Sequence, residues 1–344
     1  MKKFSDIKLN LRNMKVFENA YYWFIAPLAI IFIAMVCGTV YTISDNYDGF
    51  ANIGIDFKAG TVLTVEMDEA LVSDFDATAD FIEDIIENDF GAIISVRQTS
   101  GTTAIVLRYA NSINGTDYST DEMAESMVTI NQQICDAVEL AFYNTYNVNV
   151  SADAEMTSAS ASTSLVQSAL LAVSIAMVLM LLYVIFRFDL YSGIATICAQ
   201  LHDIIIMLSL VVIFRIQIGS TLIAGIITIV AYAINNTIVV FDRVRENTVP
   251  FKNKNKALDP RLIVNNAVSF SIKRSMFTSL TTFITISILA CFGVSTLTEF
   301  ALPIMFGIVA GFYSSTFLAP SIWGLMIQHK NGKARKAKRE SNKK

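Results

Sequence analysis

Long apolar runs constrain the fold of this chain more than any other feature. Five runs of roughly 20 residues contain no charged side chain, and a sixth is interrupted only by His202 and Asp203. A helix of about 20 apolar residues crosses the hydrocarbon core of a bilayer. The sequence therefore predicts six membrane spans, and a charged content of only 16% argues against a purely cytoplasmic enzyme. The runs cover residues 24–43, 165–186, 190–214, 218–241, 275–292 and 300–327.

The runs divide the chain into five parts. Residues 1–23 form an N-terminal segment, which is too long for the start of a signal peptide and is followed by no small-residue cleavage pattern, so the first span is expected to be an uncleaved anchor. The remaining parts are the first span at 24–43, an inserted domain at 44–160, spans two to six at 161–327 with a loop at 242–274, and a basic tail at 328–344.

The charges are distributed very unevenly. Residues 45–155 contain 21 of the 30 acidic residues but only Lys58, Arg97 and Arg108 among the basic ones. With six spans both termini lie on one side of the membrane, and that side collects 22 of the 26 Lys and Arg residues. Because positive charge accumulates in cytoplasmic segments, we expect both termini in the cytoplasm and an acidic domain outside.

The inserted domain alternates between strand and helix periodicity. Strands are expected at 61–67, 92–98, 102–109 and 146–151, with helices at about 73–90, closed by Gly91, and at 120–143. The order βαββαβ predicts a ferredoxin-like α+β domain. Since it contains no His and only Cys135, with no spacing typical of a calcium loop, we expect a binding or mechanical module without a metal site.

Polar residues recur at helical spacing inside the spans. The third span has Thr196, Gln200 and Asp203 on one face. Ionisable groups at this depth cost about 2.5 to 3.5 kcal/mol, so Asp203 is a candidate for ion or proton movement, with a satisfied structural carboxylate as the alternative. These faces should meet in a shared polar seam. Its expected members in the fourth and fifth spans are Thr221, Gly225, Thr228, Tyr232, Asn235, Asn236, Arg274, Ser275, Thr278, Thr282 and Thr285.

Other polar positions have simpler interpretations. Small residues of the sixth span, Gly307, Gly311, Ser314 and Ser315, favour close helix packing. His202 has no second histidine near it in sequence for a metal site. The charges at the end of the fourth span, beginning with Asp242 and Arg243, are either an interfacial set or a conformational element. Asp259-Pro260 should start a helix, and 261–272 is expected to be an interfacial segment that leads into the fifth span.

Five stretches together resemble the SecF family of protein-export membrane proteins, within the resistance-nodulation-division (RND) superfamily. They are GIDFKAGT (54–61), LHDIII (201–206), AINNTIVVFDRVREN (233–247), SIKRSMFTSLTTF (271–283) and EFALPIMFGIVAGFYSSTF (299–317). The resemblance implies a multi-pass accessory subunit of the Sec translocase in the bacterial inner membrane. It implies SecD, the SecYEG channel and unfolded secretory polypeptides as partners, with no nucleic acid and no cofactor.

The resemblance also assigns residues to roles. Arg274 matches the arginine of the fifth span that the family uses in ion coupling, but Asn236 occupies the position of its usual aspartate. Asn cannot titrate near neutral pH. Three explanations stay open: Asp203 carries the proton, SecD supplies the working site, or oxygens of Asn236 and Thr237 help to coordinate sodium; we favour the second. Motif positions expected to act in conformational change or at an interface are Gly54, Asp56, Gly60, Asn235, Asp242 and Arg243.

Two competing functions follow from the same residues. An RND-type exporter of small molecules or lipids would use the same spans, although such proteins usually carry a second half in the same chain. An intramembrane aspartyl protease would use Asp203 and Asp242, but the sequence lacks the flanking motifs of that class.

Overall fold

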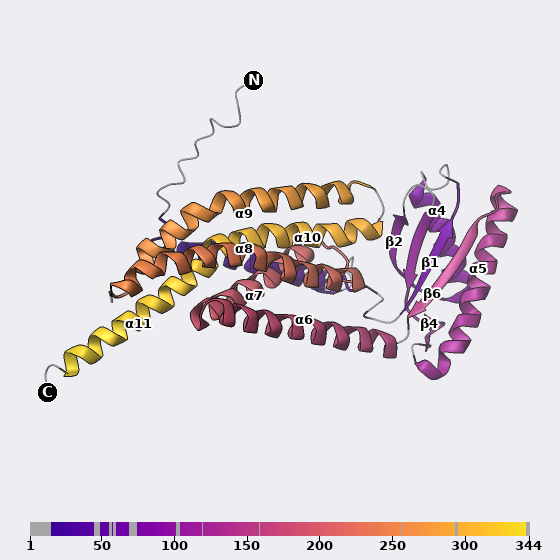
Figure 1. Cartoon of the computed structure of the whole chain (residues 1–344). Coiled ribbons are helices and arrows are strands. Elements are labelled where there is room, and N and C mark those ends of the chain that lie inside the picture. The colour runs from indigo at the N-terminus through magenta and orange to yellow at the C-terminus, as the bar shows by residue number, and fades with distance from the viewer. Residues whose placement is uncertain are drawn as a thin grey trace, which may run out of the picture.

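In a computed structural model of the chain, long helices run side by side in a bundle, and a small α/β domain lies at one end (Figure 1). The structure describes residues 15–44, 49–54, 57, 60–68, 74–100, 104–118, 120–157, 159–254, 256–292 and 295–341. The bundle contains α1 (Ile25–Ile43), preceded by a short turn η3 (Tyr22–Phe24), and α6 (Ala159–Arg187), α7 (Leu190–Ile213), α8 (Ser220–Asn253) and α9 (Pro260–Ala290). Its last member α10 (Ser295–Tyr313) continues through a π-helical turn η6 (Ser314–Leu318) into α11 (Ala319–Ser341).

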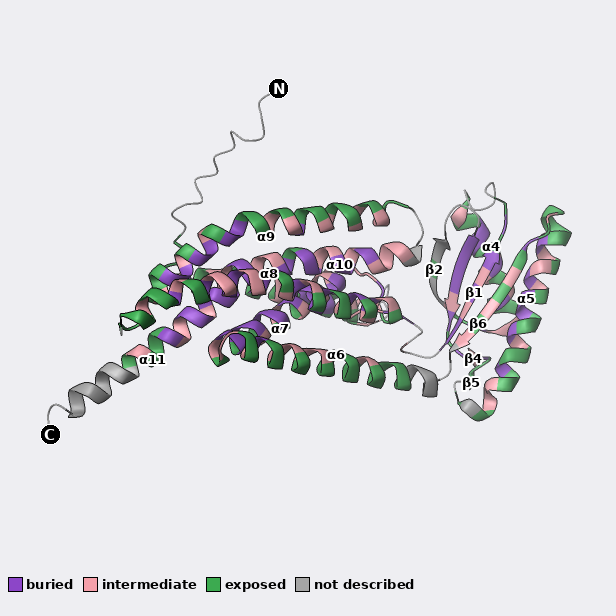
Figure 2. Cartoon of the chain, viewed as in Figure 1, coloured by how far each residue is buried: buried purple, intermediate pink, exposed green. Residues whose placement is uncertain are grey.

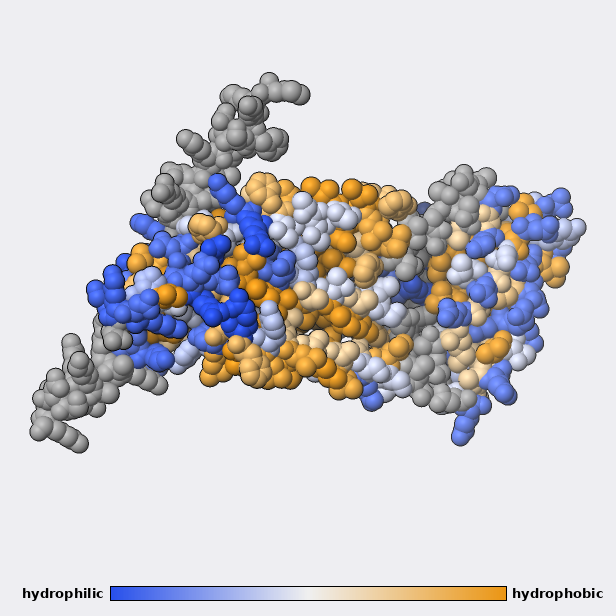
Figure 3. Space-filling model, viewed as in Figure 1, coloured by the Kyte–Doolittle hydropathy of each residue, from blue (hydrophilic) through white to orange (hydrophobic). Residues whose placement is uncertain are grey.

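Five helical stretches among the described residues are long and apolar enough to cross a membrane. They are Tyr22–Ile43, Thr163–Arg187, Leu190–Ile213, Ser220–Asn253 and Leu297–Gly332, which correspond to five of the six expected spans. The sixth, at 275–292, lies in α9, but this helix ends at Ala290 and Lys273 and Arg274 precede its apolar part. Figure 3 shows the apolar surface concentrated on the bundle, between a hydrophilic end and the α/β domain.

The region expected to be a loop at 242–274 is almost entirely helical. α8 continues to Asn253, and α9 starts at Pro260, where the Asp259 side chain accepts a hydrogen bond from the Arg261 backbone N–H at 3.1 Å. The expected helix start is therefore confirmed, and the stretch at 261–272 leads without a break into the apolar part of the same helix. That stretch is the first half of α9, because its apolar residues recur at helical spacing and pack in one buried cluster, among them Ile263, Val264 and Ala267.

The α/β domain is one antiparallel sheet with two helices. Its elements are β1 (Gly60–Glu66), α4 (Phe75–Ile85) with a π-helical end η4 (Ile86–Phe90), β2 (Ile94–Ser100), β3 (Ala104–Tyr109), a small hairpin of β4 (Ser112–Ile113) and β5 (Thr116–Asp117), a turn η5 (Asp121–Met123), α5 (Ala124–Tyr146) and β6 (Ser151–Thr157). The strand order is β2-β3-β1-β6. Gly91, with φ of 68°, ends the first helix as expected.

The last strand begins later than the sequence predicted. α5 runs to Tyr146, and Asn147 ends it in the left-handed conformation with φ of 53°, so the expected strand at 146–151 is wrong. β6 pairs with β1 from Ser151 to Thr157 instead. Its residues alternate between the sheet faces, and Ala152, Ala154 and Met156 pack against the domain core.

Both helices of the domain contribute to the same hydrophobic core. Leu63 of β1, Leu107 of β3, Ile82 of α4 and Phe142 of α5 are fully buried in one cluster, and each such side chain contributes about 1.5–3 kcal/mol. Figure 2 shows this buried layer between the sheet and its helices, and a second one where the bundle helices meet. In contrast, α6 and α1 are largely exposed, as is expected for helices that face lipid.

Candidate functional site

A polar stripe on α7 faces the inside of the bundle. Thr196, Gln200 and Asp203 are at most 1% exposed, although they lie on an apolar helix. Their spacing of four and three residues puts them on one face, as the sequence predicted. The Gln200 side-chain amide donates to the Val230 carbonyl of α8 at 3.3 Å, and the Thr196 hydroxyl donates to the Ser192 carbonyl at 2.8 Å. The stripe therefore ties α7 to α8.

Asp203 lies where α7, α8 and α10 meet. Its Oδ1 is 3.0 Å from Nδ1 of His202, and the Ser314 hydroxyl of η6 also hydrogen-bonds to the carboxylate. Gly311 allows α10 to pack closely against α7 and α8, because a Cβ at this position would lie 3.0 Å from the Ala233 Cβ and 3.6 Å from Asp203 Oδ2. Among the described residues, His202 is the one basic side chain that pairs with Asp203. The arrangement places two titratable groups in contact at membrane depth.

Asn236 joins α8 to α9. Its side-chain N–H donates to the Ser279 hydroxyl at 2.9 Å, and both residues are buried. The neighbouring Thr237 hydroxyl donates to the Ala233 carbonyl of its own helix at 3.2 Å. Ser275, one turn before Ser279, is 1% exposed, and its hydroxyl has no partner within the described part of the chain. Position 236, where the resemblance led us to expect an aspartate, thus holds a neutral amide–hydroxyl contact.

Arg274 does not join this contact. It is exposed, as are Thr281 and Thr285 further along α9, and Thr228 and Asn235 on α8 are exposed as well. We call these five residues the exposed polar set. The three threonine hydroxyls donate to carbonyls of their own helices, whereas lipid chains offer no partner to the Asn235 and Arg274 side chains. The helices α8 and α9 therefore carry two kinds of polar residue, an inward kind represented by Asn236 and an outward kind represented by Arg274.

Asp242 and Arg243 take part in separate ion pairs near the end of the bundle. Arg187 Nη2 lies 3.2 Å from Asp242 Oδ1, and Arg243 Nη1 lies 2.5 Å from Glu246 Oε2. The Arg243 guanidinium also lies 4.4 Å from the centre of the Phe270 ring. Because these pairs are partly exposed, each contributes about 0–1 kcal/mol. The Arg187–Asp242 pair links α6 to α8, and the contact between Arg243 and the Phe270 ring links α8 to α9.

The two aspartates required by the protease hypothesis are far apart. Gly311 approaches both Asp203 and Ala233, so these two residues lie at the same level of the bundle. Asp242 follows Ala233 by nine residues of the same helix, which is about 13 Å along the axis. The geometry therefore gives no catalytic dyad. The described residues also contain no group of three or more His, Cys, Asp or Glu side chains that could hold a metal ion.

Gly54 lies against the turn between α7 and α8. Its N–H donates to the Ile218 carbonyl at 2.9 Å, and the Ile218 N–H donates to the Asn52 carbonyl at 2.7 Å. A Cβ at Gly54 would lie 2.7 Å from Nε2 of the buried Gln217 and 3.2 Å from the Ile218 oxygen. Only glycine fits here without displacement of a neighbour. We call this contact between residues 49–54 and 213–219 the docking clamp.

Arg215 completes the docking clamp, a role that was not predicted from the sequence. Its Nη1 donates to the Gly49 carbonyl at 2.8 Å, and its guanidinium lies 4.9 Å from the centre of the Tyr41 ring on α1. The sequence feature that could have indicated this role is a single arginine directly after an apolar span. Gly60 is the buried first residue of β1, so the chain passes from the clamp into the sheet within a few residues. Asp56 lies outside the described residues.

The sequence analysis also missed a buried polar network in the α/β domain. The Thr61 hydroxyl donates to the Asn111 side-chain oxygen at 2.8 Å, the Asn131 amide donates to the Thr61 oxygen at 3.1 Å, and the Tyr109 hydroxyl donates to the Asn131 oxygen at 3.0 Å. Burial raises the pKa of Tyr109 well above its usual range. The network joins β1, β3 and α5, and Thr61 is the last residue of the first motif.

Comparison with known proteins extends these observations. Residues 138–329 match a family model described as "Protein export membrane protein SecD/SecF, C-terminal". A SecF of Helicobacter pylori is 34% identical over 182 residues, which cover 52% of this chain and 55% of that protein. The match thus spans about half the length of that relative. A SecF of Borreliella burgdorferi is 28% identical over 86% of this chain and 92% of its own length.

Longer relatives and solved structures match over most of this chain. A SecDF of Bacillus subtilis is 32% identical over 274 residues, 79% of this chain but only 34% of that protein. The crystal structure of SecDF from Thermus thermophilus superposes with a TM-score of 0.66 at 27% identity, covering 93% of this chain and 39% of that one. A SecDF structure in a super-membrane-facing form gives a TM-score of 0.57 at 25% identity.

Proposed function

Since this chain belongs to the SecD/SecF family of protein-export membrane proteins, we propose that it is the SecF-type accessory subunit of a Sec translocase. It works beside a SecYEG channel and, with a SecD partner, uses an ion gradient to promote export of unfolded polypeptides. The observation that carries the proposal is the structural match to SecDF. In this match 93% of this chain superposes on 39% of the SecDF chain with a TM-score of 0.66. In this proposal, the SecD partner corresponds to the remaining part of that SecDF chain.

The proposed topology has six spans, both termini in the cytoplasm and a ferredoxin-like domain outside. In support of α9 as the remaining span, this helix is 31 residues long and packs along α8 and α10. The excess of Lys and Arg at the end of the bundle away from the α/β domain supports the orientation. The strand order β2-β3-β1-β6 with two connecting helices supports the domain class.

The exposed polar set supports a partner within the membrane. Asn235 and Arg274 point out of the bundle at positions where lipid would leave them unpaired. A SecD helix that covers α8 and α9 would supply acceptors for both. A carboxylate of this partner opposite Arg274 would provide the titratable group that Asn236 lacks, which is the second of the three explanations given above. The contact between Asp203 and His202 supports the first explanation, in which Asp203 carries the proton.

Cysteine cross-linking tests the proposed interface. In a variant without the four native cysteines, Asn235→Cys should form cross-links with cysteines placed in the intramembrane helices of a co-expressed SecD. Leu171→Cys on α6 is the matched control, because Leu171 is also exposed, at 61%, but belongs to an apolar surface. Labelling of both positions by a lipid-soluble probe to the same extent, without a cross-link at Asn235, would refute the proposal.

A further inference from the structure

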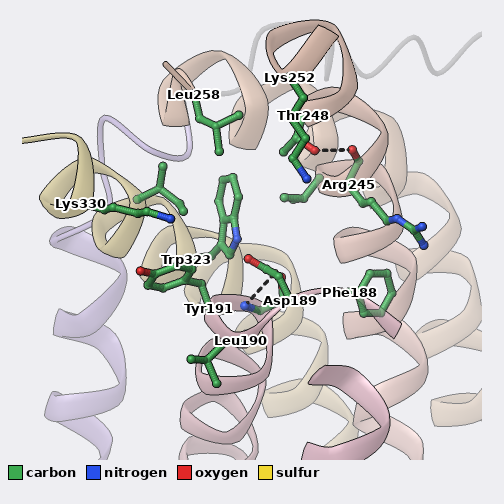
Figure 4. A pocket seen from close by; sticks show the side chains of 13 residues that line it. Phe188, Asp189, Leu190, Tyr191, Arg245, Thr248, Lys252, Leu258, Trp323 and Lys330 are labelled. Carbon is green, nitrogen blue, oxygen red and sulfur yellow. Dashed lines mark hydrogen bonds between the residues drawn. The ribbon is translucent and has the colours of Figure 1, made fainter. Parts of the chain in front are cut away.

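A basic pocket lies at the end of the bundle away from the α/β domain, and the function proposed above does not use it. The cavity has a volume of about 290 Å³ and lies between the start of α7, the end of α8 and α11 (Figure 4). Two lysines line it with their ammonium groups, Lys252 from α8 and Lys330 from α11. Arg245 of α8 also lines it, but its guanidinium points away from the cavity (Figure 4) and donates to the Arg187 carbonyl at 3.3 Å. Within the described part of the chain none of these three cations pairs with a carboxylate.

A buried indole N–H in this pocket lacks an acceptor. Trp323 is 2% exposed and lines the cavity, and its Nε1 has no hydrogen-bond partner among the described residues. Figure 4 shows the ring in the middle of the lining side chains. An unsatisfied buried donor costs about 1–3 kcal/mol. In contrast, the indole N–H of the other tryptophan, Trp23, has an acceptor, because its Nε1 donates to the Val16 carbonyl at 3.0 Å.

The one carboxylate that lines the pocket is already engaged. Asp189 caps α7 by accepting a hydrogen bond from the Ser192 backbone N–H at 3.1 Å and another from the Ser192 hydroxyl. The first N–H groups of α7 add the positive end of a helix to the same cavity. Lys330 is held over the Tyr191 ring at 5.2 Å. The pocket therefore combines positive charge with a free N–H donor, which is suited to an anion rich in acceptor oxygens.

We propose that this pocket binds the phosphate group of an anionic phospholipid. Its depth favours a lipid, because the pocket lies where apolar α6 ends at Arg187 and apolar α7 begins at Leu190. Apolar side chains, Leu258 and Ile327 among them, share the lining with the cations and can contact the glycerol end of the acyl chains. Basic pockets between membrane helices are suited to anionic headgroups. The bound phosphate bridges α7, α8 and α11.

Trp323 itself provides the assay. The chain has two tryptophans, so Trp23→Phe leaves Trp323 as the single tryptophan, excited selectively over tyrosine, while keeping a ring at position 23. The purified full-length variant in detergent is titrated with phosphatidylglycerol brominated near the glycerol end of its chains, with brominated phosphatidylcholine, and with inorganic phosphate. We expect saturable quenching by phosphatidylglycerol at a mole fraction at least fivefold lower than for phosphatidylcholine, with reversal by unbrominated phosphatidylglycerol.

Variants then separate a site from ordinary lipid contact. Lys252→Gln combined with Lys330→Gln should raise the half-quenching mole fraction at least fivefold, whereas Lys254→Gln, an exposed lysine outside the pocket lining, should leave it unchanged. If both lipids quench at the same mole fraction, and the double variant does not change this value, the proposal is wrong. If inorganic phosphate changes Trp323 fluorescence and brominated phosphatidylglycerol does not, the site belongs to a soluble phosphate compound and the assignment to lipid is wrong.

Discussion

Substitution of Gly54 by alanine tests whether the docking clamp holds the α/β domain to the bundle. The new Cβ would lie 2.7 Å from Gln217 Nε2 and 3.2 Å from the Ile218 carbonyl oxygen. Gln217 is only 6% exposed, so its side chain has little room to move away, and overpacking of this kind is destabilising. We therefore expect the backbone at Gly54 to move away from the turn.

The magnitude follows from the two hydrogen bonds of the clamp. Movement of Gly54 lengthens its own bond to the Ile218 carbonyl, now 2.9 Å, and the bond between the Ile218 N–H and the Asn52 carbonyl, now 2.7 Å. At about 0.5–1.5 kcal/mol for each bond, the clamp loses about 1–3 kcal/mol. Its open form then becomes about 5- to 150-fold more populated.

Hydrogen exchange on the full-length protein measures this change. Peptides covering 49–54 and 213–219 should exchange faster in Gly54→Ala, while the domain core stays protected. Gly225→Ala is the matched control, because that glycine is also buried but its added Cβ meets only Ile304 Cγ1 at the ordinary distance of 3.6 Å. Wild-type protection of both peptides in Gly54→Ala would refute the assignment of the clamp.

Three further outcomes are expected. Under the proposed function the exposed Arg274 charge serves the ion path more than folding, so Arg274→Ala should slow export in vesicles and leave copurification with SecD unchanged; wild-type export would contradict this. Asn131→Ala should lower the free energy of unfolding of the α/β domain by about 1–3 kcal/mol, because the Tyr109 hydroxyl loses its acceptor. Pulse proteolysis in urea measures this loss, with the exposed Gln132→Ala as control, and equal values for the two variants would refute the role of the network. Burial and nearby carboxylates raise the pKa of Cys135 to about 11, so its alkylation at pH 8 should be about 100-fold slower in the folded protein than in urea. Since the raised pKa favours the neutral thiol in the folded state, stability should fall as the pH rises above about 9; alkylation at the same rate in both states would contradict the burial.

Periodicity was sufficient to predict the inward face of α7. Thr196, Gln200 and Asp203 share one face, and that face is buried, because an ionisable residue in an apolar helix leaves a single favourable orientation. On α9 the same reasoning was insufficient. This helix has polar residues on two adjacent faces, and spacing does not decide which one packs inward. The inward face holds Ser275 and Ser279, while Arg274, expected in the seam, is exposed.

The order of elements in the α/β domain was predictable, but the last strand was not. The sequence of β6 is Ser-Ala-Asp-Ala-Glu-Met-Thr, which has no β-branched apolar residue and so gives a weak strand signal. Its register depends on pairing with β1, which lies far away in the sequence. The docking clamp could not be predicted for a similar reason, because Gly54 and Ile218 are brought together only when the whole chain folds.

The helix α7 connects the polar seam to the docking clamp. Asp203 in the seam precedes the end of α7 at Ile213 by ten residues, or about 15 Å along a rigid helix, and the docking clamp begins at that end. A shift of α7 that follows a change at Asp203, or at a partner helix packed on the bundle, would therefore reach the α/β domain through the clamp without passing through α9. Gly54→Ala interrupts this route and leaves the seam and the exposed polar set intact. If export falls in this variant while the Asn235 cross-link to SecD persists, transmission to the domain is separable from assembly.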